Sequence, residues 1–256
     1  MRRGLSLDSG SVVLLAGVAL TVGVFIGTSG IGGVLLIPVL VHPVGLSVHH
    51  AVATALASFL FIGSAGTWLF ARRGSLEWQL IWPVCAGAAF AGYIGARFAA
   101  QIEARPLALV IGLLIIGASV LILRPPPVLA PRGVRAPRRE RLVLGGVGLT
   151  AGFGSGLSGA GGPIFSVPLM IALGFPPLAT VGAAQGLQIV AALSGSAANL
   201  QAGAINAHAL ALIVVFQLAG LVAGVRLAHA LSSAALRQVA AWLCVGAGVL
   251  MVFRAV

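Results

Sequence analysis

Two long stretches of this chain carry no charged side chain. Residues 9–71 and residues 142–225 contain no Asp, Glu, Lys or Arg. A membrane-spanning helix needs about 20 apolar residues, so each stretch has room for several such helices. Only 7% of all residues are charged, against about 25% in a soluble domain. We therefore expect an all-α polytopic membrane protein, which excludes a cytosolic enzyme, a secreted domain and a disordered chain.

Apolar runs between turn signals predict eight membrane segments in two sets of four. The first set is 12–41, 50–70, 78–99 and 106–123, and the second is 142–172, 178–199, 207–228 and 236–253. Between the sets lies a basic stretch with six Arg and several Pro, residues that cannot continue a helix. The positive-inside rule places it in the cytoplasm. The predicted organisation is a transmembrane unit at 1–124, a basic linker at 125–141 and a second transmembrane unit at 142–256.

The net charge of +11 fits membrane topology better than nucleic-acid binding, because the Arg residues gather in the linker and near segment ends. No phosphate loop, nucleophile elbow or metal-ligand spacing appears in the sequence. The two cysteines lie apart in apolar stretches and indicate neither a disulfide framework nor a metal site. We expect no enzyme activity, no metal and no cofactor.

The two sets of segments repeat each other. When the chain is aligned with itself so that Ser29 falls on Ser158, Gly and Arg landmarks coincide along its length. In this alignment Gly45, Gly66, Gly74, Gly95 and Arg97 fall on Gly174, Gly195, Gly203, Gly224 and Arg226. Internal repeats are typical of secondary transporters, whose substrate sites lie near the bilayer midplane between the repeats. A duplicated membrane scaffold that transports nothing is the alternative.

The first segment of each half is interrupted by clustered glycines, in SGIGG (29–33) and SGAGG (158–162). A break inside the membrane creates a free helix N-terminus, whose unpaired N–H groups suit an anion. The alternative is that the glycines only allow close helix packing. If each broken segment crosses the membrane once, the repeats run parallel. If each is re-entrant, they are inverted, and the Arg distribution permits both.

The candidate substrate-binding residues are the glycines and polar side chains inside the apolar segments. They are Ser29, Gly30, Gly32 and Gly33 in the first break, Ser158, Gly159, Gly161 and Gly162 in the second, and Thr54, Ser58, Gln185 and Gln188 in the segments that follow. Neutral N–H and O–H donors bind an anion without a salt bridge that would slow its release. A single Ser or Thr can instead bond to a carbonyl of its own helix, whereas a Gln amide in hydrocarbon needs a partner.

Arg97 and Arg226 occupy matching positions near the ends of the third segments. The planar guanidinium suits oxyanions, so both are candidates for attracting the substrate. The alternative is that each side chain snorkels from a helix end to the membrane interface.

The motifs SGIGGVLLIP (29–38) and SGAGGPIFSVP (158–168) resemble the signature of the TauE/SafE family of sulfite and organosulfonate exporters. AVATALAS (51–58), GARFA (95–99) and GVRLA (224–228) are similar to further stretches of that family. The resemblance implies a permease for small anions such as sulfite or sulfonates, in the bacterial cytoplasmic membrane. The sequence departs from the family pattern at Ala183, the position of the second half that corresponds to Thr54 in the first.

We therefore expect export of a small anion by alternating access at the repeat interface. An uptake carrier or channel for another small anion is the alternative within transport. A coupling proton or cation, and assembly as a homodimer, remain open.

Overall fold

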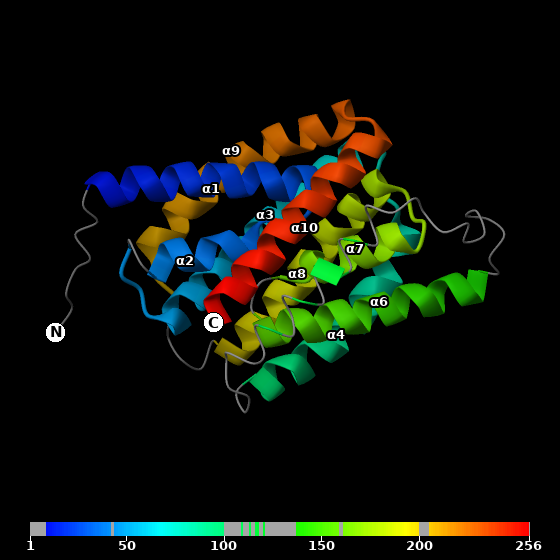
Figure 1. Ribbon diagram of the computed structural model, residues 1–256, viewed down its shortest axis with the longest axis horizontal. Helices are drawn as coiled ribbons and strands as arrows, with labels where there is room; N and C mark the ends of the chain where they lie inside the picture. The colour runs from blue at the N-terminus through cyan, green and yellow to red at the C-terminus, as the bar shows by residue number, and fades with distance from the viewer. Residues whose placement is uncertain are drawn as a thin grey trace.

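The computed structural model describes residues 9–41, 44–99, 137–158, 161–199 and 205–255, together with single positions between 109 and 120. Every regular element in these ranges is a helix (Figure 1). The elements are α1 (Ser9–Ser29), the short 3-10 helix η1 (Gly33–Leu35), α2 (Leu36–Val41), α3 (Val48–Arg72), α4 (Trp78–Ala99), α6 (Pro137–Ser158), α7 (Pro163–Ala172), α8 (Pro177–Asn199), α9 (Ala207–Ala230) and α10 (Ser233–Ala255). Of the predicted segment 106–123, the structure describes only single positions.

Four of the described helices are long and apolar enough to cross a membrane. The candidate spans are Val12–Ser29, Ala53–Arg72, Pro177–Ser194 and Ala207–Ala230. Large apolar side chains also lie on the outer surface, where Val13, Trp82 and Phe253 are at least 70% exposed. Such a surface suits lipid and not water. The predicted all-helical membrane class is confirmed.

Both first segments are interrupted where the glycines cluster. α1 ends at Ser29, and Gly30 follows with a φ of 78°. In the second half, Gly161 has a φ of 90° just before α7 begins at Pro163. This left-handed backbone favours glycine at both positions. Proline suits the first turn of a helix because the N–H that it lacks would be unpaired there.

The helix that opens the second half begins earlier than expected. α6 starts at Pro137, inside the range 125–141 that was assigned to the basic linker. Proline at a first helical position is favourable, so the proline that was taken to break a helix here starts one.

The main helix contacts join one half to the other. α1 packs along α9, and α6 packs along α4 (Figure 1). A Cβ built at Gly23 would overlap the backbone of Gln217, and one built at Gly152 would overlap the backbone of Ala88. The shift that carries Ser29 onto Ser158 also carries the first of these contacts onto the second. The same helix packing is therefore made twice, with the halves exchanging roles.

The second helices of the two halves, α3 and α8, pack against each other in opposite directions. Along α3, Gly66 meets Gln185 of α8, and Phe70, one turn later, meets Gly182, one turn earlier. The starts of these helices, Val48 and Pro177, are matched by the same shift of the sequence. Equivalent helices of the two halves thus run antiparallel.

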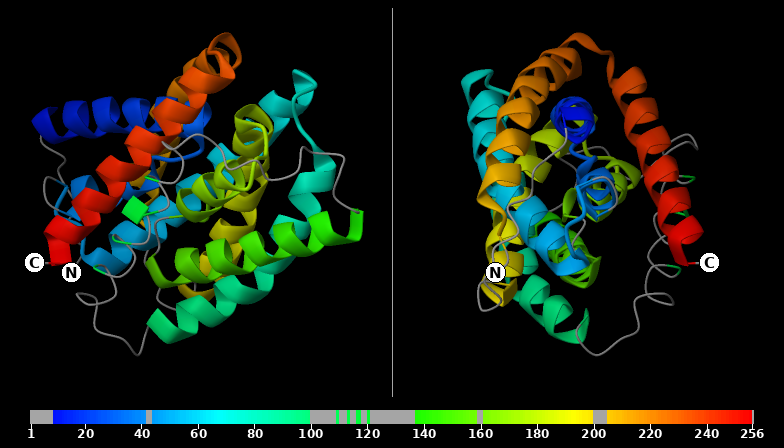
Figure 2. Two further views of the ribbon diagram at one scale, coloured as in Figure 1. Left: turned by 45° about the vertical axis from the view of Figure 1, so that its right-hand side comes forward. Right: turned by 90° about the vertical axis from the view of Figure 1, so that its left-hand side faces the viewer.

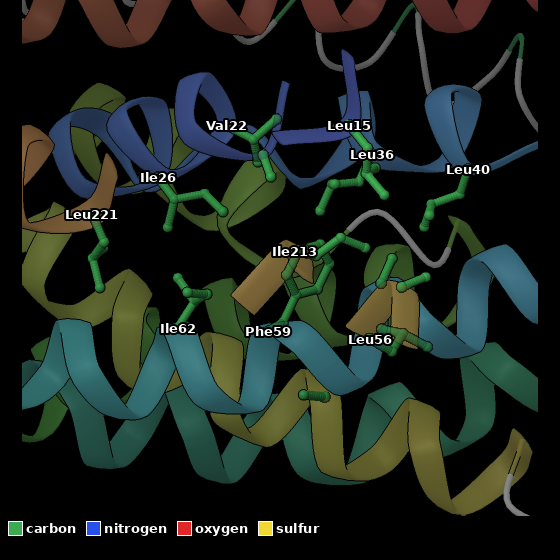
Figure 3. Close-up of a cluster of buried hydrophobic side chains, with 14 of the residues drawn as sticks. Leu15, Val22, Ile26, Leu36, Leu40, Leu56, Phe59, Ile62, Ile213 and Leu221 are labelled. Atoms are coloured by element: carbon green, nitrogen blue, oxygen red, sulfur yellow. The ribbon is translucent and has the colours of Figure 1, made fainter. Parts of the chain in front are cut away.

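The largest buried cluster lies between α1, α2, α3 and α9. Figure 3 shows Val22 and Ile26 of α1 facing Phe59 and Ile62 of α3, with Leu221 of α9 beside them. α10 crosses one face of the bundle and touches α1, α7 and α8 only lightly (Figures 1 and 2). The interior at the level of the two breaks is therefore built from both halves.

Candidate functional site

The two glycine breaks lie together inside the bundle. A Cβ placed on Gly30 would be 3.6 Å from the Cβ of Pro163, at the start of α7. The ring of Phe59 in α3 bridges the breaks, because it packs directly on Gly33 and lies 3.7 Å from the Cβ position of Gly161. The juxtaposition of the breaks puts the start of η1 and the start of α7 in one region.

This region contains backbone donors that are not used within the described structure. The N–H groups of Gly32 and Gly33 at the start of η1, and of Ile164 in the first turn of α7, form no hydrogen bond with another described residue. All three residues are buried. Unpaired N–H groups and the positive dipole end at a helix start favour a negative ligand.

The hydroxyl groups that were predicted to bind substrate form hydrogen bonds within the protein. Ser29 Oγ donates to the carbonyl of Phe25 at 2.9 Å and accepts from the N–H of Ile31 at 3.2 Å. Ser58 Oγ donates to the carbonyl of Ala55 at 2.8 Å. Thr54 Oγ1 accepts from the N–H of Asn206 at 3.2 Å, just before α9. Ser29 and Ser58 thus form the helix-carbonyl bond that is the ordinary alternative to a ligand contact.

The two glutamines predicted to bind substrate keep side-chain atoms without a hydrogen-bond partner. Gln185 Nε2 donates to the carbonyl of Ile26 at 2.9 Å, and the same carbonyl accepts from the N–H of Gly30 at 2.8 Å. Gln185 therefore holds the end of α1 at the first break. Its Oε1, and Oε1 of Gln188, have no hydrogen-bond partner although both side chains are at most 2% exposed.

Sequence reasoning missed Gln217 in α9. Its side chain is fully buried, and neither Oε1 nor Nε2 has a hydrogen-bond partner. The repeat gave no signal for it, because the matching residue of the first half is Ala88. The signal that could have found it is an uncharged amide in the middle of an apolar run.

Comparison with known proteins identifies the family. The model of the family described as sulfite exporter TauE/SafE matches residues 14–251, nearly the whole chain and both halves. The chain belongs to the TauE/SafE family. Membership in this family indicates a membrane transporter of sulfite or related anions. No curated protein and no solved structure matched the chain.

The interior of this TauE/SafE protein is electrically neutral in the part that the structure describes. The buried polar side chains there are all hydroxyls or amides, namely Thr28, Ser29, Thr54, Ser58, Ser155, Ser166, Thr180, Gln185, Gln188 and Gln217. An anion at the breaks would meet no buried carboxylate among them. It would also meet no buried counter-charge, so its binding would depend on dipoles and hydrogen bonds.

Three predicted site residues of this TauE/SafE protein are not fully described. The side chains of Ser158 and Arg97 lie outside the described part of the structure, and so does the whole of Gly159. Arg226 is exposed on α9, four residues before that helix ends. The structure therefore does not bring Arg226 to the breaks. Gly161 and Gly162 are buried at them.

Proposed function

We propose that this chain is a permease that exports small oxyanions, such as sulfite or organosulfonates, across the bacterial cytoplasmic membrane. The observation that carries the proposal is the meeting of two broken segments, one from each half, with unpaired N–H groups in a neutral interior. The proposed site comprises the breaks at 29–33 and 158–162, with Gln185 and Gln188 beside them. Thr54 and Ser58 shape the site through α3.

The proposed architecture is a pair of four-segment repeats, at 1–124 and 142–256, related by a pseudo-two-fold axis in the membrane plane. The antiparallel packing of α3 and α8 supports the inverted arrangement, in which each broken first segment is re-entrant. Inverted repeats with discontinuous helices at the substrate site are common in secondary transporters. Access alternates when the two halves exchange conformations around the fixed site.

Arg226, and Arg97 at the matching position, have a separate proposed role. Arg226 is exposed near the end of α9, and Arg97 stands two residues before the end of α4. A cationic side chain at a membrane interface raises the local concentration of anions. We assign both to attraction of the substrate toward the entrance.

Sulfite transport into inside-out membrane vesicles tests the function. Vesicles that contain the protein should accumulate sulfite faster than vesicles without it, because the cytoplasmic face points outward. Substituting Gly161 with Ala should slow transport severely, since a side chain at φ 90° strains the break. Gly145→Ala is the matched control, because a Cβ at Gly145 meets no atom within 4 Å.

Two outcomes would count against the proposal. Absence of flux for every sulfur oxyanion would exclude the export function. Unchanged flux in Gly161→Ala, with the protein folded, would show that the backbone of the break has no part in transport.

A further inference from the structure

A polar side chain stands inside the largest apolar cluster of the protein. Gln217 lies on α9 one turn from Ile213 and one turn from Leu221, and both of these point into the cluster formed with α1 and α3 (Figure 3). Its amide is fully buried and has no hydrogen-bond partner. Buried polar groups in native proteins are nearly always paired, so an amide left unpaired in both atoms indicates a missing ligand.

Gln185 reaches the same level of the bundle from α8. The Thr54–Asn206 bond and the bond from Arg73 to the carbonyl of Val225 fix one register between α3 and α9, and this register sets Gln217 opposite Ala65. Gln185 lies against Gly66, the next residue of α3. On α1, the backbone of Gln217 packs at Gly23, and the side chain of Gln185 binds the carbonyl of Ile26, one turn further along. Gln217 and Gln185 therefore lie at one height along α1 and α3.

The two amides offer different groups to a ligand. A carbonyl oxygen only accepts hydrogen bonds, so the bond to Ile26 fixes the nitrogen of Gln185 on that side and leaves Oε1 as a free acceptor. Gln217 has two free N–H donors and a free acceptor. A ligand that pairs the Gln185 acceptor with the Gln217 donors must donate one hydrogen bond to Gln185 and accept hydrogen bonds from Gln217.

The charge of the ligand is limited by the same surroundings. α1 and α8 carry no charged or titratable side chain, and the buried polar groups of the described residues are neutral. The cost of burying an ion rises steeply with its charge, so a neutral site favours a monoanion over a dianion.

We propose that Gln185 and Gln217 bind the hydroxyl-bearing monoanion of a sulfur oxyacid, bisulfite, in preference to the sulfite dianion and to sulfonates. The O–H of bisulfite is donated to Gln185 Oε1, and its anionic oxygens accept from Gln217 Nε2. Sulfite dianion and sulfonates have no O–H to give. This inference rests on the proposed function and narrows its substrate class.

None of the titratable side chains that the structure describes forms a hydrogen bond with Gln185 or Gln217. On the helices that pack around the pair, the described ones are His50 and Arg72 on α3, His208, Arg226 and His229 on α9, Cys85 and Tyr93 on α4, and Arg237 and Cys244 on α10. The pH dependence of binding should therefore follow the ionisation of bisulfite itself, which occurs near neutral pH.

The test measures the unfolding temperature of the whole chain in detergent, with sulfite, methanesulfonate or sulfate added at about pH 6 and about pH 8.5. Ligands that bind the folded state raise this temperature. Sulfite should stabilise the protein at the lower pH, and the total concentration needed should rise about tenfold or more at the higher pH. Methanesulfonate and sulfate should give no comparable effect at either pH.

Gln217→Leu separates binding from folding. Removing an unpaired amide from an apolar cluster should raise the unfolding temperature without ligand, while the affinity for sulfite falls about tenfold or more. The matched control is Gln79→Leu on α4, where the side chain is exposed, and it should change neither quantity.

The outcomes distinguish the two proposals. If methanesulfonate stabilises as well as sulfite and pH has no effect, the protonated ligand is excluded while the anion permease stands. If no sulfur oxyanion binds or is transported, the proposed function itself fails. If Gln217→Leu lowers the unfolding temperature and leaves sulfite affinity unchanged, Gln217 is a structural residue and the assignment is wrong.

Discussion

Single glycines set the distance between helices in this protein. At Gly95, Gly148, Gly220 and Gly224 a Cβ would overlap backbone atoms of the neighbouring helix. Lipid provides no hydrophobic driving force between helices, so close backbone contact and van der Waals packing must hold them together. These positions therefore matter more for stability than their small size suggests.

Gly224→Ala should destabilise the protein by about 1–3 kcal/mol, the usual cost of overpacking a tight contact. The added methyl would meet the backbone of Val24 in α1, and a backbone cannot rotate away as a side chain can. Gly17→Ala is the control, since a Cβ there meets nothing within 4 Å. Thermal unfolding in detergent should show a lower midpoint for the first variant only. Equal midpoints would contradict the close α1–α9 contact.

Two buried hydroxyls provide a second contrast. Thr54→Val removes the acceptor for the N–H of Asn206, which leads into α9, and should cost about 1 kcal/mol. Ser58→Ala removes only a bond to the carbonyl of Ala55 in the same helix, so it should be nearly neutral. Denaturant titration of both variants measures the difference, and a larger loss for Ser58→Ala would show that the two roles are reversed.

At the scale of helices, the apolar pattern predicted much of what the structure contains. The predicted segment 78–99 coincides with α4, and 50–70 lies within α3 with two residues to spare at each end. The breaks were found because clustered glycines recur in both halves. Hydropathy failed at the start of α6, because Pro137 and the Arg residues that follow it read as a linker although they form a helix.

The sequence could not predict which helices pack together. In a membrane both faces of a helix are apolar, so the pattern of hydrophobic residues does not point to the partner. The pairing of α1 with α9 depends on backbone contact at Gly23 and Gly224, which a single sequence does not distinguish from glycines facing open space such as Gly17. Gln217 was missed for a related reason, since its burial and its lack of a hydrogen-bond partner depend on the helices that pack around it.

At the scale of the whole molecule, the two halves are not separate bodies. The first segment of each half packs on the third segment of the other, α1 on α9 and α6 on α4. The halves must therefore be present together for the principal helix contacts to form.

Dividing the chain within residues 125–136, between α4 and α6, tests this dependence. The two pieces produced together should assemble and transport sulfite, because no described helix is cut. Either piece alone should be unstable, since its first helix lacks its partner. Recovery of one piece as a stable folded protein, by size-exclusion chromatography in detergent, would show that the exchanged contacts are dispensable.

The exchanged contacts also bear on how such a chain arose. A polypeptide with only one half could bury its first helix only against a second copy of itself. Because α3 and α8 run in opposite directions, those two copies would have had to insert into the membrane with opposite orientations. A single half that made the same contacts would therefore need both orientations in one membrane, whereas joining the halves in one chain removes this requirement.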